Sequence, residues 1–362
     1  MRCILSFPVV CCLGLGIATF FGLPARRVTP AAAPAISWTV QASGTTASLR
    51  GVAAVDERTA WASGANGTVL RTLDGGTTWS AVGVRGAKTI DFRDIEGFSA
   101  DEAVVMGVGR PARIFRTTDG GRSWRETYHN DVEGIFLDGL AFFDNRNGLA
   151  IGDPMEGRFF LLATKDAGET WTPLPLGSRP LALGKEAAFA ASGTSLAVLG
   201  KDRAWLCTGG SVSRIWRSAD RGRSWDTVSS RLLEGPPSAG GFSIAFLDDE
   251  RGIAVGGDFR AEDAPEGNAA VSRDGGRTWR RVDGRRPGGF REAVAFIPGT
   301  TPPLALTVGP SGSDYSIDVG VRWIPIMGPS GFHAVSLSRT TPAAAWAVGR
   351  NGLIAKFNLS RP

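Results

Sequence analysis

The decapeptide SRDGGRTWRR, residues 272–281, decides the fold because close copies of it stand elsewhere in the chain. TTDGGRSWRE occupies residues 117–126, and TLDGGTTWSA occupies residues 72–81. Two further copies and a weaker last one complete a set of six turns with the pattern Ser/Thr-x-Asp-x-Gly-x-Thr/Ser-Trp. Their aspartate and tryptophan pairs are Asp74 and Trp79, Asp119 and Trp124, Asp166 and Trp171, Asp220 and Trp225, Asp274 and Trp279, and Asp318 and Trp323.

The spacing of these aspartates is the length of one structural repeat. Successive aspartates are 45, 47, 54, 54 and 44 residues apart, which is typical of a four-stranded propeller blade. Each turn follows two short apolar segments that are bounded by Gly, Pro or Asp, as strands are. Seven such units have a first strand, and KEAAFAASG (185–193) is predicted to supply the first strand of the fourth.

The two ends of the chain are predicted to share one blade. The C-terminal unit stops after its third strand, whereas ISWTVQASG (36–44) has the Trp-led look of an outer strand. Pairing the two would remove an open sheet edge, which is an aggregation hazard. We therefore predict an all-β protein, a single seven-bladed β-propeller over residues 36–362 that is closed by its N-terminal strand.

The repeated turn itself is predicted to serve the fold and not catalysis. The Asp side chain can accept hydrogen bonds from backbone N–H groups of its own tight turn, and the Gly tolerates positive φ. The Trp then carries a large apolar surface into the gap between neighbouring blades. The six aspartates are accordingly no candidates for active-site acids.

Residues 1–35 read as a secretory signal peptide. Arg2 precedes an uncharged apolar run over residues 3–23, and Ala33-Pro34-Ala35 is an Ala-x-Ala cleavage site. We expect cleavage after Ala35 and export to the periplasm or the cell exterior. The alternative is a retained N-terminal anchor, since the run is nearly long enough to span a bilayer, so membrane contact is expected only through residues 1–35.

Removal of this segment changes the charge and cysteine balance. Three arginines leave, so the formal net charge falls from +5 to +2, and nucleic acid is not an expected partner. Cys207 stays as the single cysteine, which excludes an intrachain disulfide.

No cofactor or metal is expected. There is no Gly-x-Gly-x-x-Gly between a strand and a helix to hold a dinucleotide. His129 and His333 are the only histidines, and the spacing of loop carboxylates such as Asp153 and Asp258 does not support a Ca²⁺ site.

The turns resemble the Asp-box (BNR) repeats of sialidase-like propellers. The wider text, including FRDIEGF (92–98), GRPARIFRTTDGGRSW (109–124) and GGFSIAFLDDERGIAVGGDF (240–259), is similar to bacterial relatives of the photosystem II stability/assembly factor family. The resemblance covers residues 37–358. It implies a non-enzymatic protein that holds a partner during assembly of a complex.

A site for that partner is predicted on the face opposite the turns, at the channel mouth. Charged residues stand where the predicted inner strands begin and in the loops between second and third strands. They are Arg50, Arg93, Asp94, Asp138, Asp153, Arg158, Glu186, Arg214, Asp258, Arg291, Glu292 and His333. One interpretation is a mutually paired ring that only solvates the mouth; the other is a mixed-charge groove for a polar peptide or an anionic group.

In the groove hypothesis, Arg50, Arg93 and Arg291 engage acidic groups of the partner. Asp94, Asp138 and Glu292 orient those arginines. The expected partner is another protein or an extracytoplasmic polymer, and the propeller is expected to act as a monomer.

The alternative is a carbohydrate-active hydrolase or lyase that uses carboxylates on the same face, such as Asp94 with Asp138 or Glu292. A sialidase is disfavoured because neither of the only two tyrosines, Tyr128 and Tyr315, is predicted to point at the channel. The environment of the acids separates the two classes. An enzyme would show a desolvated acid with a raised pKa beside a cleft, whereas a binding face would show each acid paired with an arginine.

Overall fold

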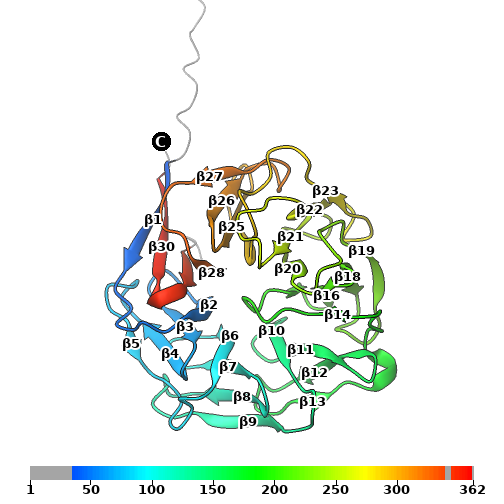
Figure 1. Ribbon diagram of the computed structural model, residues 1–362. Coiled ribbons are helices and arrows are strands. Elements are labelled where there is room, and N and C mark those ends of the chain that lie inside the picture. The colour runs from blue at the N-terminus through cyan, green and yellow to red at the C-terminus, as the bar shows by residue number, and fades with distance from the viewer. Residues whose placement is uncertain (1–34, 339–343, 361–362) are drawn as a thin grey trace, which may run out of the picture.

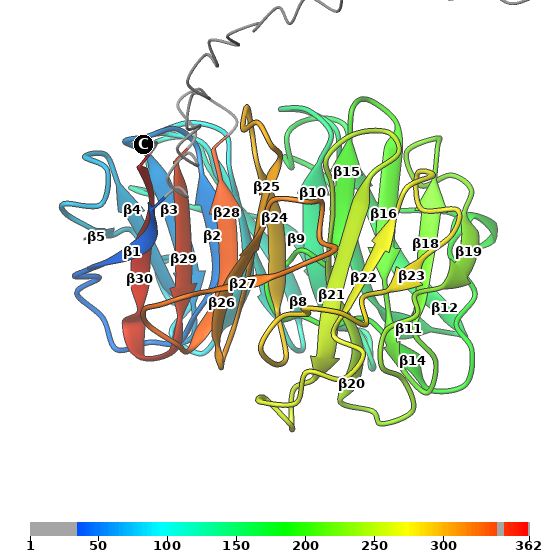
Figure 2. The same ribbon diagram turned by 90° about the horizontal axis from the view of Figure 1, so that it is seen from above.

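The computed structural model describes residues 35–338 and 344–360, and their strands form seven sheets around a central channel (Figure 1). Seen edge-on, the sheets make a disc with connecting loops on both faces (Figure 2). The predicted signal segment lies outside the described residues except for Ala35. Within the described part of the chain, no helix is long and apolar enough to cross a membrane.

Each blade is an antiparallel sheet of four strands that runs from the channel to the rim. The inner strands are β2 (Leu49–Ala54), β6 (Asp91–Gly97), β10 (Leu137–Phe142), β15 (Leu196–Leu199), β20 (Ala239–Phe246), β24 (Ala293–Ile297) and β28 (Phe332–Leu337). The second strands are β3 (Ala60–Gly64), β7 (Ala103–Val108), β11 (Gly148–Met155), β16 (Arg203–Cys207), β21 (Gly252–Asp258), β25 (Leu304–Gly309) and β29 (Ala345–Gly349). The third strands are β4 (Thr68–Thr72), β8 (Ala112–Thr117), β12 (Arg158–Thr164), β18 (Arg214–Ser218), β22 (Ala269–Ser272), β26 (Gly312–Ser316) and β30 (Ile354–Ser360). The outer strands are β5 (Ser80–Ala81), β9 (Arg125–Asn130), β13 (Thr172–Pro173), β19 (Asp226–Ser229), β23 (Arg280–Arg281), β27 (Ile324–Ile326) and β1 (Ala35–Gln41).

The seven-bladed fold predicted from the repeats is therefore confirmed, but the inner strand of the fourth blade is not the predicted one. That place belongs to β15, whereas of residues 185–193 only β14 (Glu186–Ala187) is a strand, and it pairs with β17 (Gly209–Gly210) beside the fifth blade. Side chains from other blades satisfy the backbone that follows β14. Asp153 accepts the N–H of Ala188, and Arg93 donates to the carbonyl of Ala190, so this segment needs no ladder.

The Asp-Gly turns have the same pattern of hydrogen bonds, and the turn at Asp274 is an example. Its Oδ1 accepts the N–H of Thr278 at 2.9 Å, and its Oδ2 accepts the Thr278 hydroxyl at 2.6 Å. The hydroxyl of Ser272 donates to Asp274 and accepts the N–H of Gly276. The weakest sequence match keeps this geometry, because Arg322 supplies both the N–H and a guanidinium donor to Asp318.

The tryptophans that follow these turns pack between blades, as predicted. Trp171 of the third blade lies in one apolar cluster with Val104 and Met106 of the second, and its ring meets Phe142 edge-on at 5.8 Å. Comparable clusters link each blade to the next. The repeated sequence thus encodes the contact by which one blade holds its neighbour.

Strand β1 closes the ring by pairing along its whole length with β30, so the two ends of the described chain lie side by side (Figure 1). Trp38 of β1 packs on Phe332 and Phe357 with ring centroids 5.2 and 5.4 Å away, and its indole donates to Ser313 Oγ at 2.9 Å. Gln41 accepts the indole N–H of Trp346 and that of Trp79, which belongs to the first blade. The strand therefore ties the last blade to the first.

Replacing Trp38 by Ala is expected to lower the free energy of unfolding by about 3–5 kcal/mol, because a buried aromatic ring at the closure is lost. Denaturant unfolding followed by tryptophan fluorescence and circular dichroism measures the change. Val40→Ala is the control, since Val40 lies on the same strand but is 57% exposed. A cost no larger than that of the control would contradict a closing role for β1.

Candidate functional site

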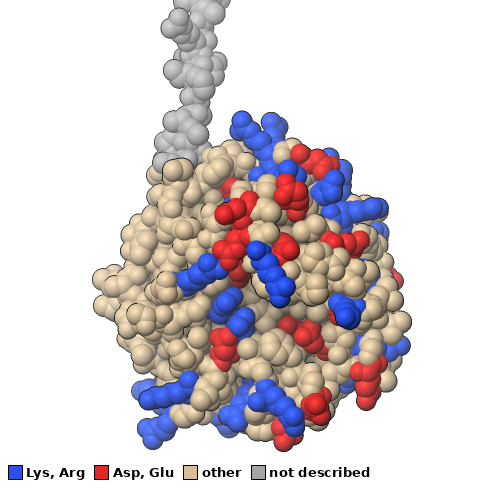
Figure 3. All heavy atoms as spheres, viewed as in Figure 1, with Lys and Arg blue, Asp and Glu red and all other residues tan. Residues whose placement is uncertain are grey.

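The inner strands begin on the face opposite the Asp-Gly turns, and a cavity of about 340 Å³ opens there at the channel mouth. Figure 3 views the molecule from this side and shows basic and acidic side chains intermixed around its centre. Residues from six blades and from the segment that precedes β15 of the fourth blade contribute to the cavity wall. They are Arg50, Arg93, Phe136, Asp138, Asp153, Ala188, Phe189, Ala190, Ala191, Phe242, Phe259, Glu262, Phe290, Glu292, His333 and Arg350.

One sector of this wall is cationic, and its arginines are paired with acids. Arg50 Nη1 lies 3.6 Å from a carboxylate oxygen of Glu292, which also lies 2.9 Å from Nδ1 of His333. Burial lowers the pKa of Arg50; Glu292 opposes this, while the charges of Arg93 and Arg350 add to it. Arg50, Arg93 and Arg350 therefore lie close enough together at the mouth for the last two to act on the first.

The other two arginines of this sector have their own acidic partners. Arg93 donates to Asp91 at 2.6 Å and to the carbonyl of Ala190 at 2.8 Å. Arg350 pairs with Glu262 of the loop that follows β21. Because these pairs are partly solvated, they hold the guanidinium groups in place without sealing them off.

The third blade contributes an acidic sector of different character. Asp138 is buried, and neither of its carboxyl oxygens has a hydrogen-bond partner among the described residues. Burial raises the pKa of Asp138 well above its usual range; the nearby charge of Asp153 adds to this, and that of Arg93 opposes it. Burial also raises the pKa of Asp153 to about 6, although the N–H of Ala188 holds it down.

An aromatic flank built from blades four to six completes the cavity. Phe189 stacks on Phe242 with centroids 3.9 Å apart, and Phe290 meets Phe242 edge-on at 4.6 Å. Phe259 lies edge-on to the stacked pair and is 42% exposed. The sequence prediction named only charged residues and His333, so it did not include these phenylalanines. Part of its signal was present, because Phe242 stands at the bulge of its inner strand, where Arg50, Arg93, Asp138 and His333 stand in theirs.

The structure brings six of the predicted residues together in the cavity: Arg50, Arg93, Asp138, Asp153, Glu292 and His333. The expectation that Arg291 engages a partner is wrong. Arg291 is 2% exposed, and it donates to Asp314 at 2.6 and 2.9 Å and to Ser311 at 2.8 Å. Its guanidinium is bonded to the third strand of its own blade, β26, and to the turn before it.

The expectation that Asp94 orients an arginine is also wrong. Its carboxylate accepts the N–H groups of Leu140 and Ile95 at 2.7 and 2.8 Å, which ties the inner strands of blades two and three together. Burial raises the pKa of Asp94 to about 8. Gly193, at φ +77°, packs directly on this carboxyl, since a Cβ there would lie 2.3 Å from its oxygens.

The remaining predicted residues surround the cavity without lining it. Glu186 is buried and bonded to Arg214 at 3.0 Å and to the hydroxyl of Thr208, which fixes β14 against the fourth blade. Arg158 donates to the carbonyl of Arg179, and Asp258 accepts the N–H of Arg260. Each of these residues is thus bonded to a residue of the propeller itself outside the cavity wall.

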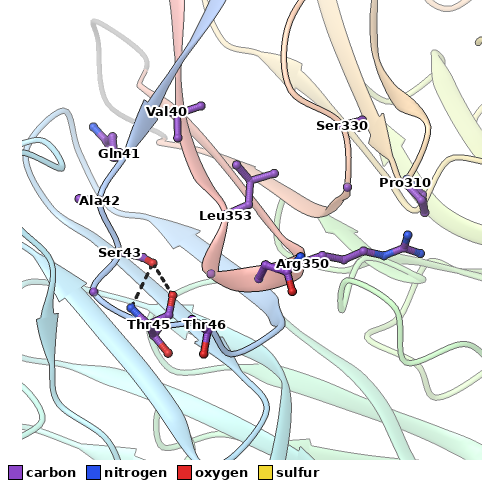
Figure 4. Close-up of a pocket in the computed structure, with 14 residues that line it drawn as sticks. Val40, Gln41, Ala42, Ser43, Thr45, Thr46, Pro310, Ser330, Arg350 and Leu353 are labelled. Atoms are coloured by element: carbon purple, nitrogen blue, oxygen red, sulfur yellow. Dashed lines mark hydrogen bonds between the residues drawn. The ribbon is translucent and has the colours of Figure 1, made fainter.

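A second, more open hollow of about 1030 Å³ lies beside the last blade (Figure 4). It is lined by residues 40–46, by η2 (Arg350–Gly352) and by nearby loop residues, and Arg350 borders both cavities. The hydroxyl of Ser43 is already bonded to the backbone of Thr45. Arg350 is the only charged residue among those that line it, so the candidate site is the mouth cavity. Over the part of the chain that the structure describes, no group of three or more His, Cys, Asp or Glu is placed to hold a metal ion.

The fold and the charged mouth define a seven-bladed propeller with a cavity at its channel mouth, and comparison with known proteins narrows this class of protein. Residues 31–131 match the family model for "Photosynthesis system II assembly factor YCF48", which confirms the resemblance to that family. A structure of "YCF48 bound to D1 peptide" is 19% identical, with a TM-score of 0.61, and the alignment covers 89% of this chain and 96% of that one.

Two further solved structures match at a similar level. A streptogramin B lyase is 12% identical over 90% of this chain and 98% of its own, with a TM-score of 0.58. The WD40 propeller domain of Doa1 is 12% identical over 90% of this chain and 97% of its own, with a TM-score of 0.57. These likenesses establish the fold, which hosts enzymes and binding proteins alike. No curated protein shows significant similarity to the chain.

The raised pKa of Asp138 predicts a stability difference that depends on pH. Above the ordinary carboxyl pKa, the unfolded chain loses this proton while the folded protein keeps it, so stability falls as the pH rises. Asp138→Asn removes that loss. The variant should gain stability over the native chain by up to about 1.4 kcal/mol for each pH unit above about pH 4, until Asp138 ionises in the folded protein.

Melting temperatures of both proteins between pH 4.5 and pH 8 measure this gain. Asp153 and Arg93 are the charged groups that act on Asp138, and both are unchanged in the variant. A stability difference that does not vary with pH would contradict a buried, protonated Asp138.

Proposed function

We propose that this protein is a non-enzymatic, assembly-factor-like propeller that binds a protein partner through its channel-mouth cavity. The observation that carries the proposal is the pairing of each mouth arginine with an acid: Arg50 with Glu292, Arg93 with Asp91, and Arg350 with Glu262. Among the described residues, Asp138 and Asp153 are the acids of the mouth that do not follow this pattern. A related structure in which the propeller YCF48 is bound to a peptide supports a protein partner.

Binding would work by exchange of partners at these ion pairs. Because these arginines are already ordered, they lose little conformational entropy when they bind a carboxylate of the partner. Solvent-exposed pairs contribute little to stability, so little is lost when Asp91 or Glu262 is displaced. The aromatic flank then offers apolar surface for side chains that neighbour the partner's charged groups.

The proposal includes export. Residues 1–35 would direct the chain out of the cytoplasm and be cleaved after Ala35, which leaves residues 36–362 as a monomeric propeller in the periplasm or outside the cell. A retained segment would instead anchor the propeller to the membrane. The basis is the sequence pattern of a short basic end, an apolar core and an Ala-x-Ala site.

Neutralising the mouth arginines should abolish partner capture. Residues 36–362 serve as bait in an envelope extract, beside an Arg50→Gln/Arg93→Gln variant whose folding is verified by circular dichroism. Loss of two partly buried charge contacts should weaken retention of the captured protein at least about tenfold.

The matched control is Arg122→Gln/Arg277→Gln, which removes the same charge from the Asp-Gly turns on the opposite face. The control should retain the partner. Equal capture by all three proteins, or no specific capture by the native chain, would overturn the proposed function.

Asp138 and Asp153 favour a second candidate, a carbohydrate-active hydrolase or lyase. They are two neighbouring carboxyls, both with raised pKa values, beside a cavity, which is an arrangement found in acid–base catalysts. A screen of oligosaccharides tests it. Turnover that is lost in both Asp138→Asn and Asp153→Asn would establish this function, whereas no turnover is expected from a binding protein.

A further inference from the structure

The starting point is the contrast between Asp138 and the other acids of the mouth. Glu292, Asp91 and Glu262 each face an arginine, whereas both oxygens of Asp138 lack a partner among the described residues, although it is 99% buried. A buried polar group without a partner destabilises a fold. Native proteins keep few such groups, and those they keep often serve function.

The neighbouring strand brings a second carboxyl to the same wall. Asp153 on β11 lines the cavity with Asp138 of β10, and the charge of Asp153 disfavours ionisation of Asp138. Arg93 is close enough to influence Asp138, but its guanidinium already donates to Asp91 and Ala190. Within the part of the chain that the structure describes, neither acid forms an ion pair with a basic side chain.

The chemistry next to these acids suits a cation with an apolar body. Phe189 and Phe242 form a stacked pair on the adjoining flank, and Phe259 is partly exposed beside them. Aromatic faces attract ammonium and guanidinium groups and pack against the methylenes that carry them. An anion, by contrast, would be drawn to Arg50 and Arg93 of the first two blades.

We propose that the third-blade wall of the cavity is a receptor for a protonated amine or guanidinium group, held between Asp138 and Asp153 and flanked by the phenylalanines. The inference rests on the proposed function and deepens it, because it names a group that a partner has to present. Its sources are a lysine or arginine side chain of the partner protein and a free amine in the compartment.

The test uses three probes of one size: n-butylammonium, 1-butanol and butyrate. Saturation-transfer NMR and chemical-shift titration with residues 36–362 measure their binding. Butylammonium should bind at least about tenfold more tightly than the neutral alcohol, and Asp138→Asn/Asp153→Asn should remove that preference. Asp258→Asn is the matched control, because Asp258 is a carboxylate on the same face that does not line the cavity.

Equal binding of the alcohol and the amine, or binding that survives in the double variant, would overturn the inference. If the double variant fails to fold, Asp153→Asn alone tests the same wall, since Asp153 is less buried than Asp138. Butylammonium binding is read independently of partner capture. Loss of capture in Arg50→Gln/Arg93→Gln with no amine binding would therefore sustain the proposed function and reject the amine receptor.

Capture of the partner by the Asp138→Asn/Asp153→Asn variant distinguishes the two sources. Loss of capture together with loss of butylammonium binding assigns the cation to the partner protein. Retained capture with loss of butylammonium binding assigns the site to a free amine.

Discussion

The ladder between β1 and β30 is the contact on which the rest of the structure depends. It joins segments more than 300 residues apart in the chain, and it turns a row of sheets into a ring in which every inner strand has two neighbours. Without it, the last blade would present an unpaired edge, and Phe332 and Phe357 would lose the cover of Trp38. The mouth cavity needs this closure because its wall draws on the first and the last blade together, through Arg50 and His333.

The fold could be predicted from the sequence because the residues that fix each blade lie within its own repeat. The Asp-Gly turn fixes the hairpin between third and outer strands, and the Trp fixes the contact with the next blade. The prediction failed at residues 185–193, where the apolar pattern is that of a strand. There the backbone is satisfied by Asp153 and Arg93 of other blades, and a contact between blades leaves no trace in the local pattern.

Contacts between distant residues, which the local pattern does not show, also explain why only some of the site residues were predicted correctly. Register along the inner strands identified the residues near the mouth, but Arg50 and Arg291 look alike in sequence. Only the structure shows that Asp314, on a third strand, buries Arg291, while Arg50 meets Glu292 and stays beside the cavity. Asp94 and Asp138 likewise stand near the starts of neighbouring inner strands. Asp94 accepts two backbone N–H groups, whereas neither carboxyl oxygen of Asp138 has a partner among the described residues.

The loop that follows β21 shows how a repeat can alter the channel mouth without altering the ring. It leaves the fifth blade, accepts the N–H of Phe290 through the carbonyl of Glu262, and reaches Arg350 of the seventh blade through the Glu262 side chain. The extra residues of a long repeat therefore emerge over the mouth and leave the hydrophobic contacts between blades unchanged. Insertions in such loops can therefore reshape the opening while the ring that supports it stays constant.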